Sequence, residues 1–215
     1  MASRTDKPLS EVIEQRRDTP SFDGKPVPDA DLKKILDAGL NMPSGFNLQP
    51  WRFVVVRTPE LRRKLRAASF NQANVEEASV VIVACGDKDG WRSDMEEMIR
   101  MGRERGMTEN YAESASVIIP EFMSSYPNLT AWLNRHVMIA FTAMMLMAET
   151  LGYDTSCTEG LESDKVCLVL NLPISYEVVS LLGIGRLRGP DKYNGGRFSM
   201  QRTVFDGEYG KPMKL

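Results

Sequence analysis

Histidine, cysteine and long uninterrupted apolar runs are scarce in this chain of 215 residues. It has one histidine, His136, and three cysteines, Cys85, Cys157 and Cys167. None of the cysteines is paired at the spacing of a metal site. We therefore expect neither a zinc centre nor a cysteine–histidine nucleophile pair, and we expect His136 to be a hydrogen-bonded core or interface residue.

Net charge is also nearly absent, at -2, which gives no reason to expect a nucleic acid or an anionic membrane as a partner. No apolar segment typical of a secretory signal follows Met1. The odd number of cysteines in apolar surroundings favours reduced thiols and a cytoplasmic location. The most apolar stretch, residues 130–151, contains Arg135, His136 and Glu149, and it lacks the run of ~20 apolar residues that a membrane span needs.

The patterns that are present predict a chain of mixed secondary structure. Apolar residues at helical spacing or local start signals predict helices over residues 10–17, 29–40, 92–105, 115–124, 130–151 and 163–170, and another from residue 58 or 59. Apolar, β-branched runs predict strands over residues 51–56, 79–86, 153–157 and 176–183. The predicted fold is an α+β sandwich, with a mainly antiparallel sheet of about four or five strands flanked by helices.

No repeat or linker divides the chain, so residues 1–215 are expected to form a single domain. The least regular part, residues 87–128, is rich in methionine, arginine, glutamate and serine, with scattered aromatic residues. Such side chains form an adaptable apolar wall, or they only hold the two predicted helices of this region against the rest of the protein.

A loop over residues 41–51 joins a predicted helix to a predicted strand. Its two prolines and its glycine prevent regular structure, while Ser44, Asn47 and Gln49 offer hydrogen-bonding side chains. Such a loop suits the binding of a flat polar ligand. The alternative is an ordinary connection in which Ser44 and Asn47 bind their own backbone.

Three other segments have binding chemistry. Arg16 and Arg17 follow a short helix and suit a phosphate, although a solvated arginine pair is the commoner case. Asn71 and Gln72 offer amides with both donors and acceptors, or they form a polar turn. Gly160 lets the backbone approach a planar ligand closely.

The order of these segments resembles the nitroreductase family. The sequence Pro-Ser-Gly-x-Asn-x-Gln-Pro-Trp at residues 43–51, followed by a β-branched strand, is similar to the flavin loop of that family. Arg16-Arg17-Asp18-Thr19-Pro20-Ser21-Phe22 is similar to its N-terminal motif. Thr158-Glu159-Gly160 and Gly195-Gly196-Arg197-Phe198 are similar to its later turn and to its basic phosphate segment.

The resemblance implies a three-layer nitroreductase-like sandwich, an intertwined homodimer, and FMN between the subunits. Residues 87–128 would then be a helical cap over the active site. No residue is expected to be catalytic, because flavin N5 carries the chemistry, with NAD(P)H as hydride donor and a nitroaromatic, quinone or similar small molecule as acceptor in a ping-pong cycle. The residues that the resemblance assigns to FMN are Arg16, Arg17, Asp18, Pro43, Ser44, Gly45, Asn47, Asn71, Gln72, Thr158, Glu159, Gly160 and Arg197.

Within this set, Arg16, Arg17 and Arg197 are expected at the phosphate, and the backbone near Glu159 and Gly160 at N5 and O4. Asp18 stands where many relatives have serine, and we expect it to orient an arginine or to offer only its backbone N–H. Two alternatives stay open. One is a flavin-fragmenting or dehalogenating branch of the family, and the other is a flavin-binding sensor or storage protein without turnover.

Overall fold

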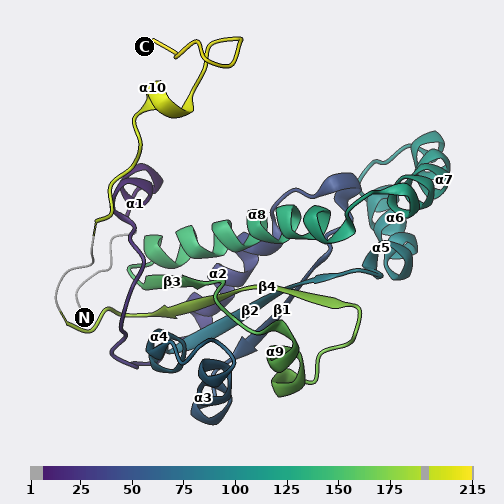
Figure 1. The fold of residues 1–215 in the computed structure, drawn as a ribbon. Coiled ribbons are helices and arrows are strands. Elements are labelled where there is room, and N and C mark those ends of the chain that lie inside the picture. Colours follow the sequence, from purple (N-terminus) through teal and green to yellow (C-terminus); the bar gives the residue numbers. More distant parts are fainter. Residues whose placement is uncertain (1–6, 190–193, 215) are drawn as a thin grey trace.

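In the computed structural model, which describes residues 7–189 and 194–214, the centre is a four-stranded sheet (Figure 1). Its strands lie in the order β1-β2-β4-β3, and every neighbouring pair is antiparallel. The predicted sheet is therefore confirmed. The strands are β1 (Trp51–Val56), β2 (Val80–Asp87), β3 (Asp154–Thr158) and β4 (Tyr176–Gly185).

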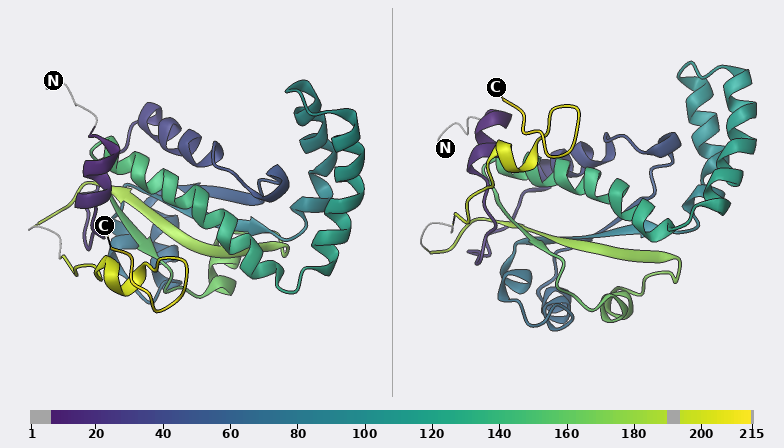
Figure 2. Two further views of the ribbon diagram at one scale, coloured as in Figure 1. Left: turned by 90° about the horizontal axis from the view of Figure 1, so that it is seen from above. Right: turned by 45° about the horizontal axis from the view of Figure 1, so that its top comes forward.

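Strand β2 is the centre of the core, because each of its residues is buried. A continuous apolar run such as Val80 to Cys85 is typical of a strand that is covered on both faces. Helices α2 (Asp29–Leu40) and α8 (Leu129–Thr150) cover one face of the sheet. The other face is covered by helices α3 (Pro59–Ala67), α4 (Ala73–Glu77) and α9 (Ser163–Leu170) (Figures 1 and 2).

The long helix α8 packs closely on α2. A side chain at Gly39 would place its Cβ 2.7 Å from the Cγ atom of Met144, so glycine is what allows the two helices to approach. Phe141 and Met144 of α8 are fully buried in this contact layer. In the described part of the chain, no helix combines the length and the apolarity needed to cross a bilayer.

An arm of three helices extends from the end of the sheet: α5 (Gly90–Ser93), α6 (Met95–Glu104) and α7 (Glu109–Ser125) (Figure 1). The predicted helix over residues 92–105 is divided at Asp94, and α7 is longer than the predicted 115–124. It begins at Glu109 because the side chain of Thr108 caps it and accepts a hydrogen bond from the Tyr111 N–H at 3.3 Å. Trp91, Ile119 and other buried side chains of the arm form a core of their own with the start of α8.

Helix α1 and residues 194–214 lie on the α8 side of the sheet (Figures 1 and 2). Helix α1 spans Leu9–Gln15 rather than the predicted 10–17. Its N-cap residue is Pro8, so Ser10 lies inside the helix and does not cap it. Residues 194–214, with α10 (Met200–Thr203), extend beyond α1 and away from the sheet (Figures 1 and 2). Within this tail, the Arg202 guanidinium lies 3.9 Å from the centre of the Phe198 ring.

Candidate functional site

The predicted site residues fall into two groups and one outlier. The strand-end group lies along β3 and beyond its end, and the loop group lies in the connection between α2 and β1. The outlier, Arg197, is on the tail, where its guanidinium donates to the Gly196 carbonyl at 2.6 Å. The strand-end group contains Arg16, Arg17, Asp18, Asn71, Gln72, Thr158, Glu159 and Gly160, and the loop group contains Pro43, Ser44, Gly45 and Asn47.

Asp18 attaches the segment after α1 to strand β3. It forms a parallel bridge with Thr155, and its carboxylate accepts a hydrogen bond of 2.8 Å from the N–H of Cys157. The Asp18 carboxylate thus bonds to the strand backbone, and the expectation that it orients an arginine stays a prediction. Asp18 therefore fixes where Arg16 and Arg17 lie relative to Glu159 and Gly160.

Arg16 and Arg17 line a polar cavity of about 290 Å³ together with Lys7, Glu149 and Asp154. The two carboxylates already accept backbone hydrogen bonds, Glu149 from Thr155 at 3.0 Å and Asp154 from Leu187 at 2.8 Å. The cavity thus combines three cations with carboxylates that also hold the fold. Such a set of charges favours an anion, and two guanidinium groups favour a phosphate.

Gln72 and Asn71 follow a turn with left-handed backbone at Phe70 and Asn71, whose φ angles are 50° and 58°. The Gln72 amide donates to the carbonyl of Gly160 at 2.8 Å and to that of Ser69 at 3.1 Å. Gln72 thus uses its amide nitrogen within the protein, and its contact with a ligand stays a prediction. Its carbonyl oxygen is the part of the amide that could accept from one. Asn71 is exposed, and its contact with a ligand stays a prediction.

Phe70 is a member of the strand-end group that the sequence analysis missed. Its ring is 65% exposed, and a Cβ added at Gly160 would lie 3.7 Å from it. Nothing in the local sequence pointed to Phe70, since its partner lies far along the chain. Thr158, in contrast, is the buried last residue of β3, and its carbonyl accepts from Ser180 at 3.2 Å. The side chain of Thr158 is therefore buried and its carbonyl is already bonded, so its predicted contact with FMN would have to use other atoms.

The loop group is strained. Three non-glycine residues, Phe46, Asn47 and Gln49, have left-handed backbone, with φ angles of 53°, 56° and 46°. Each such residue costs about 1–2 kcal/mol, and strain of this kind is concentrated at functional sites. The Ser44 hydroxyl accepts a hydrogen bond from the Gln49 N–H at 2.9 Å, as the alternative of an ordinary connection expects for Ser44, while the part of that alternative that concerns Asn47 stays a prediction. The O–H of Ser44 is a separate donor, which can bind a ligand.

The loop rests on the first half of α8. A Cβ at Gly45 would lie 3.2 Å from both the His136 Nε2 atom and the Trp132 ring, which explains the glycine. The His136 and Trp132 rings meet edge to face at 4.2 Å. Within the described residues the His136 Nδ1 atom is buried without a hydrogen-bond partner. The prediction of a satisfied core histidine is therefore wrong for the single chain, and its role at an interface stays a prediction.

The two groups lie at opposite corners of the sheet. Strands β1 and β3 are at opposite edges, about 14 Å apart. Through its partners, Trp51 is level with Glu177 of β4, whereas Thr158 is level with Leu181, about 13 Å further along that strand. Helix α8 gives a similar separation. His136 lies beside the loop group and Glu149 lines the cavity of Arg16 and Arg17, and the helix rises about 20 Å between these two residues.

The thiols and the metal-binding residue types add no second chemistry. All three cysteines are unpaired, and burial raises the pKa of Cys85 to about 12. Its thiol is therefore protonated at neutral pH, as expected for a structural residue. Among the described residues, no three side chains of histidine, cysteine, aspartate or glutamate are arranged to hold a metal ion.

Comparison with known proteins gives one consistent result. Residues 13–186 match the model of the nitroreductase family. The chain is 32% identical over 190 residues to a Thermus thermophilus protein named NADH dehydrogenase, covering 88% of this chain and 91% of that protein. It is 28% identical to an enone reductase of conjugated linoleic acid (CLA) biosynthesis from Lactiplantibacillus plantarum over 187 residues, which are 83% and 85% of the two chains.

Solved structures agree with this result. The crystal structure of an Exiguobacterium sibiricum protein in complex with FMN superimposes with a TM-score of 0.80 and 26% identity, over 95% of this chain and 99% of that one. A similarity of this extent also accounts for the sheet order and for the position of the helical layers.

Proposed function

The chain belongs to the nitroreductase family, and on this premise we propose that it is an FMN-dependent oxidoreductase. The proposed reaction takes hydride from NAD(P)H and passes reducing equivalents to a nitroaromatic, a quinone or a similar acceptor in a ping-pong cycle. When bound, FMN supplies the two-electron chemistry at its N5 atom, and the protein supplies binding, orientation and electrostatics.

The observation that carries the proposal is the arrangement of the strand-end group. A cavity with Lys7, Arg16 and Arg17 lies on one side of β3, and exposed backbone at Glu159 and Gly160 follows the strand. Gly160 is about 10 Å beyond Cys157 in extended chain, the residue whose N–H is bound by Asp18. A cationic cavity at the start of β3 and an open glycine-containing backbone after the end of that strand fit an elongated ligand with a phosphate at one end and a flat ring at the other.

The protein residues have separate tasks in this proposal. Arg16 and Arg17 bind the phosphate through charge-assisted hydrogen bonds. The N–H groups near Glu159 and Gly160 orient the ring without using a side chain. Phe70, whose ring stands exposed beside Gly160, limits how an acceptor approaches. The names of the relatives support the same donor and acceptor classes, since one is an NADH dehydrogenase and another an enone reductase.

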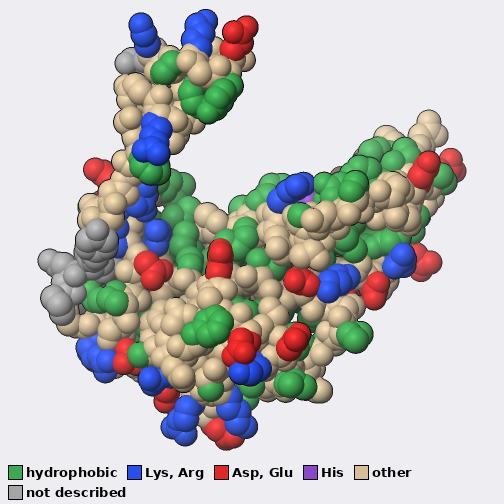
Figure 3. Space-filling model, viewed as in Figure 1, with side chains coloured by type: hydrophobic (Ala, Val, Ile, Leu, Met, Phe, Trp, Pro, Cys, Tyr) green, Lys and Arg blue, Asp and Glu red, His purple; other side chains and the backbone are tan. Residues whose placement is uncertain are grey.

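We further propose that a second copy of the chain completes the site. The loop group and the strand-end group are about 20 Å apart, and three fused six-membered rings are much shorter than this separation. The outward face of α8 between the two groups is apolar, with Ile139 40% exposed. Figure 3 shows a hollow above this helix, bounded by the arm and the tail. In the dimer, the loop of one subunit would face the strand-end group of its partner, and the tails would be exchanged.

The test is spectroscopic. The purified protein should show the absorbance bands of an oxidised flavin, and NADH or NADPH should bleach them under anaerobic conditions. Addition of a quinone or a nitroaromatic should restore the bands. A flavin that resists both nicotinamides would contradict the enzyme and favour a sensor or storage protein. Bleaching that no acceptor reverses, with new flavin fragments detected by mass spectrometry, would favour the fragmenting branch.

A further inference from the structure

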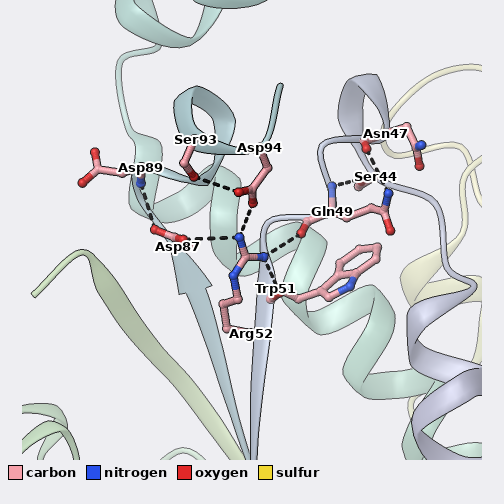
Figure 4. A network of polar contacts seen from close by, with 9 residues as sticks. All are labelled: Ser44, Asn47, Gln49, Trp51, Arg52, Asp87, Asp89, Ser93 and Asp94. Carbon is pink, nitrogen blue, oxygen red and sulfur yellow. Dashed lines mark hydrogen bonds and ion pairs between the residues drawn. The ribbon is translucent and has the colours of Figure 1, made fainter. Parts of the chain in front are cut away.

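Arg52, the second residue of β1, joins three separate parts of the molecule (Figure 4). Its Nη1 atom donates to the carbonyl of Gln49 at 3.3 Å and to that of Trp51 at 2.9 Å. Its Nη2 atom pairs with Asp87 at the end of β2, at 3.4 Å, and with Asp94 at the start of α6. One guanidinium group thus contacts the strained loop, the sheet and the arm.

Both carboxylates are held by their own elements. Asp94 accepts a hydrogen bond from the Ser93 hydroxyl at 2.9 Å, and Asp87 accepts one from the Asp89 N–H at 3.1 Å. The backbone makes room for the guanidinium, because a Cβ at Gly90 would lie 3.3 Å from Nη2 of Arg52. Carboxylates that are fixed in this way orient the planar fork of the arginine, which a lysine cannot reproduce.

Arg52 binds Gln49, one of the three loop residues with left-handed backbone. Gln49 has left-handed backbone, and its N–H and its carbonyl are both bound, by Ser44 and Arg52 respectively. In the proposed dimer this loop faces the strand-end group of the partner subunit, and the family resemblance predicts that its Ser44 and Asn47 contact the flavin. A movement of α6 that displaces Asp94 therefore also displaces the Arg52 guanidinium, which donates to the Gln49 carbonyl.

We propose that Arg52 is a positioning residue that couples the arm to the loop. The arm then sets the grip of the loop on the flavin through Asp94, Arg52 and Gln49. This inference rests on the proposed function for its consequence at the flavin. The mechanical link itself needs no flavin and is tested separately.

The first measurement is hydrogen exchange on the full-length protein without flavin. Asp94→Asn changes only the arm side of the link, yet it should speed exchange of the loop amides of residues 47–49. Strand β4 should be unaffected. The matched control is Glu177→Gln, which breaks the Lys88–Glu177 pair. That pair is similarly exposed, at 39% and 29% against 28% and 42% for Arg52 and Asp94, and it should leave the loop amides unchanged.

The second measurement is FMN affinity by fluorescence titration. Asp94→Asn and Arg52→Lys should each weaken binding by about tenfold, the lower end of the loss expected for a charge-assisted hydrogen bond. The double variant should be no weaker than Arg52→Lys, because both changes break one link. Additive effects, or loop exchange in Asp94→Asn equal to that of the wild type, would overturn the coupling. If exchange rises as expected while no version of the protein binds FMN, the link stands and the proposed function fails.

Discussion

The side-chain amide of Gln72 donates a hydrogen bond of 2.8 Å to the carbonyl of Gly160, joining the turn before α4 to the segment that follows β3. The same amide nitrogen would lie 3.3 Å from a Cβ placed at Gly160. Gly160 is thus fixed by its carbonyl and restricted in the size of its side chain. A larger residue at this position would disturb Gln72 as well as any ligand that lies against the glycine.

Gly160→Val should therefore weaken FMN binding by at least about tenfold. The valine must displace the Gln72 amide, losing a hydrogen bond worth about 0.5–1.5 kcal/mol, and it also stands against the ring. Glu159→Gln is the control, because it keeps the backbone and the size of the side chain. Fluorescence titration measures both affinities. Loss of hydride transfer in Glu159→Gln with FMN still bound would assign the Glu159 carboxylate a chemical role.

Arg16→Ala should weaken FMN binding by roughly tenfold to a hundredfold, because a charge-assisted hydrogen bond contributes about 1.5–3 kcal/mol. The same loss is predicted for Arg197→Ala, if the tail of one subunit brings this residue to the phosphate. Arg63→Ala is the control, since the Arg63 side chain is 69% exposed on α3. Unchanged affinity in Arg197→Ala would remove Arg197 from the site and leave the phosphate to Lys7, Arg16 and Arg17.

Ile139→Glu should convert the proposed dimer to a monomer and reduce its flavin content at the same time. The residue lies on the outward face of α8 and is 40% exposed, so a charge there does not disrupt the core of the single chain. Met144 is unsuitable for this test because it is fully buried against α2. Leu168→Glu is the control, being 82% exposed on the other side of the sheet. Light scattering that shows an FMN-loaded monomer of the wild type would contradict the dimer.

His136 should make the stability of the protein depend on pH. Burial, and to a smaller degree the charge of Arg135, lower the pKa of His136 below the reference value of 6.5. The unfolded chain then binds more protons just below that pH, so the free energy of unfolding should rise as the pH increases through this range. Thermal unfolding at about pH 5.5 and about pH 7.5, on either side of the ordinary histidine pKa, should show this rise.

His136→Gln removes the only histidine, and the rise between these two pH values should shrink. Carboxylates titrate in a more acidic range and do not mimic the effect. If the wild type and the variant show the same pH dependence, then the Nδ1 atom of His136 has a partner in the assembled protein that restores its ordinary pKa.

The sequence was most informative where one local signal decides the structure. Residues 29–40 and 51–56 were predicted with the bounds that α2 and β1 have, because apolar spacing alone separates a helix from a strand there. The start of α7 was missed. Its first turns have little apolar periodicity, and the cap that begins the helix is a single threonine, Thr108.

For the site, the sequence located the segments but not their contacts. Ser44 and Gln72 were both predicted to face a ligand, and both spend hydrogen bonds inside the protein. The partner of Gln72 is 88 residues away, and no local pattern shows such a pairing. Arg52 was visible in the sequence only as a cation in a strand, because Asp87 and Asp94 meet it only in the folded chain.

The position of β2 also has a consequence for synthesis on the ribosome. This strand is buried along its whole length between β1 and β4. Strand β1 emerges just before it, but β4 follows only after residues 88–175 have been made. At about 5–20 residues per second, one edge of the most apolar strand stays unpaired for several seconds or more. The nascent chain is therefore exposed to edge-to-edge aggregation in this interval, and changes that slow translation between β2 and β4 should lower the yield of folded protein.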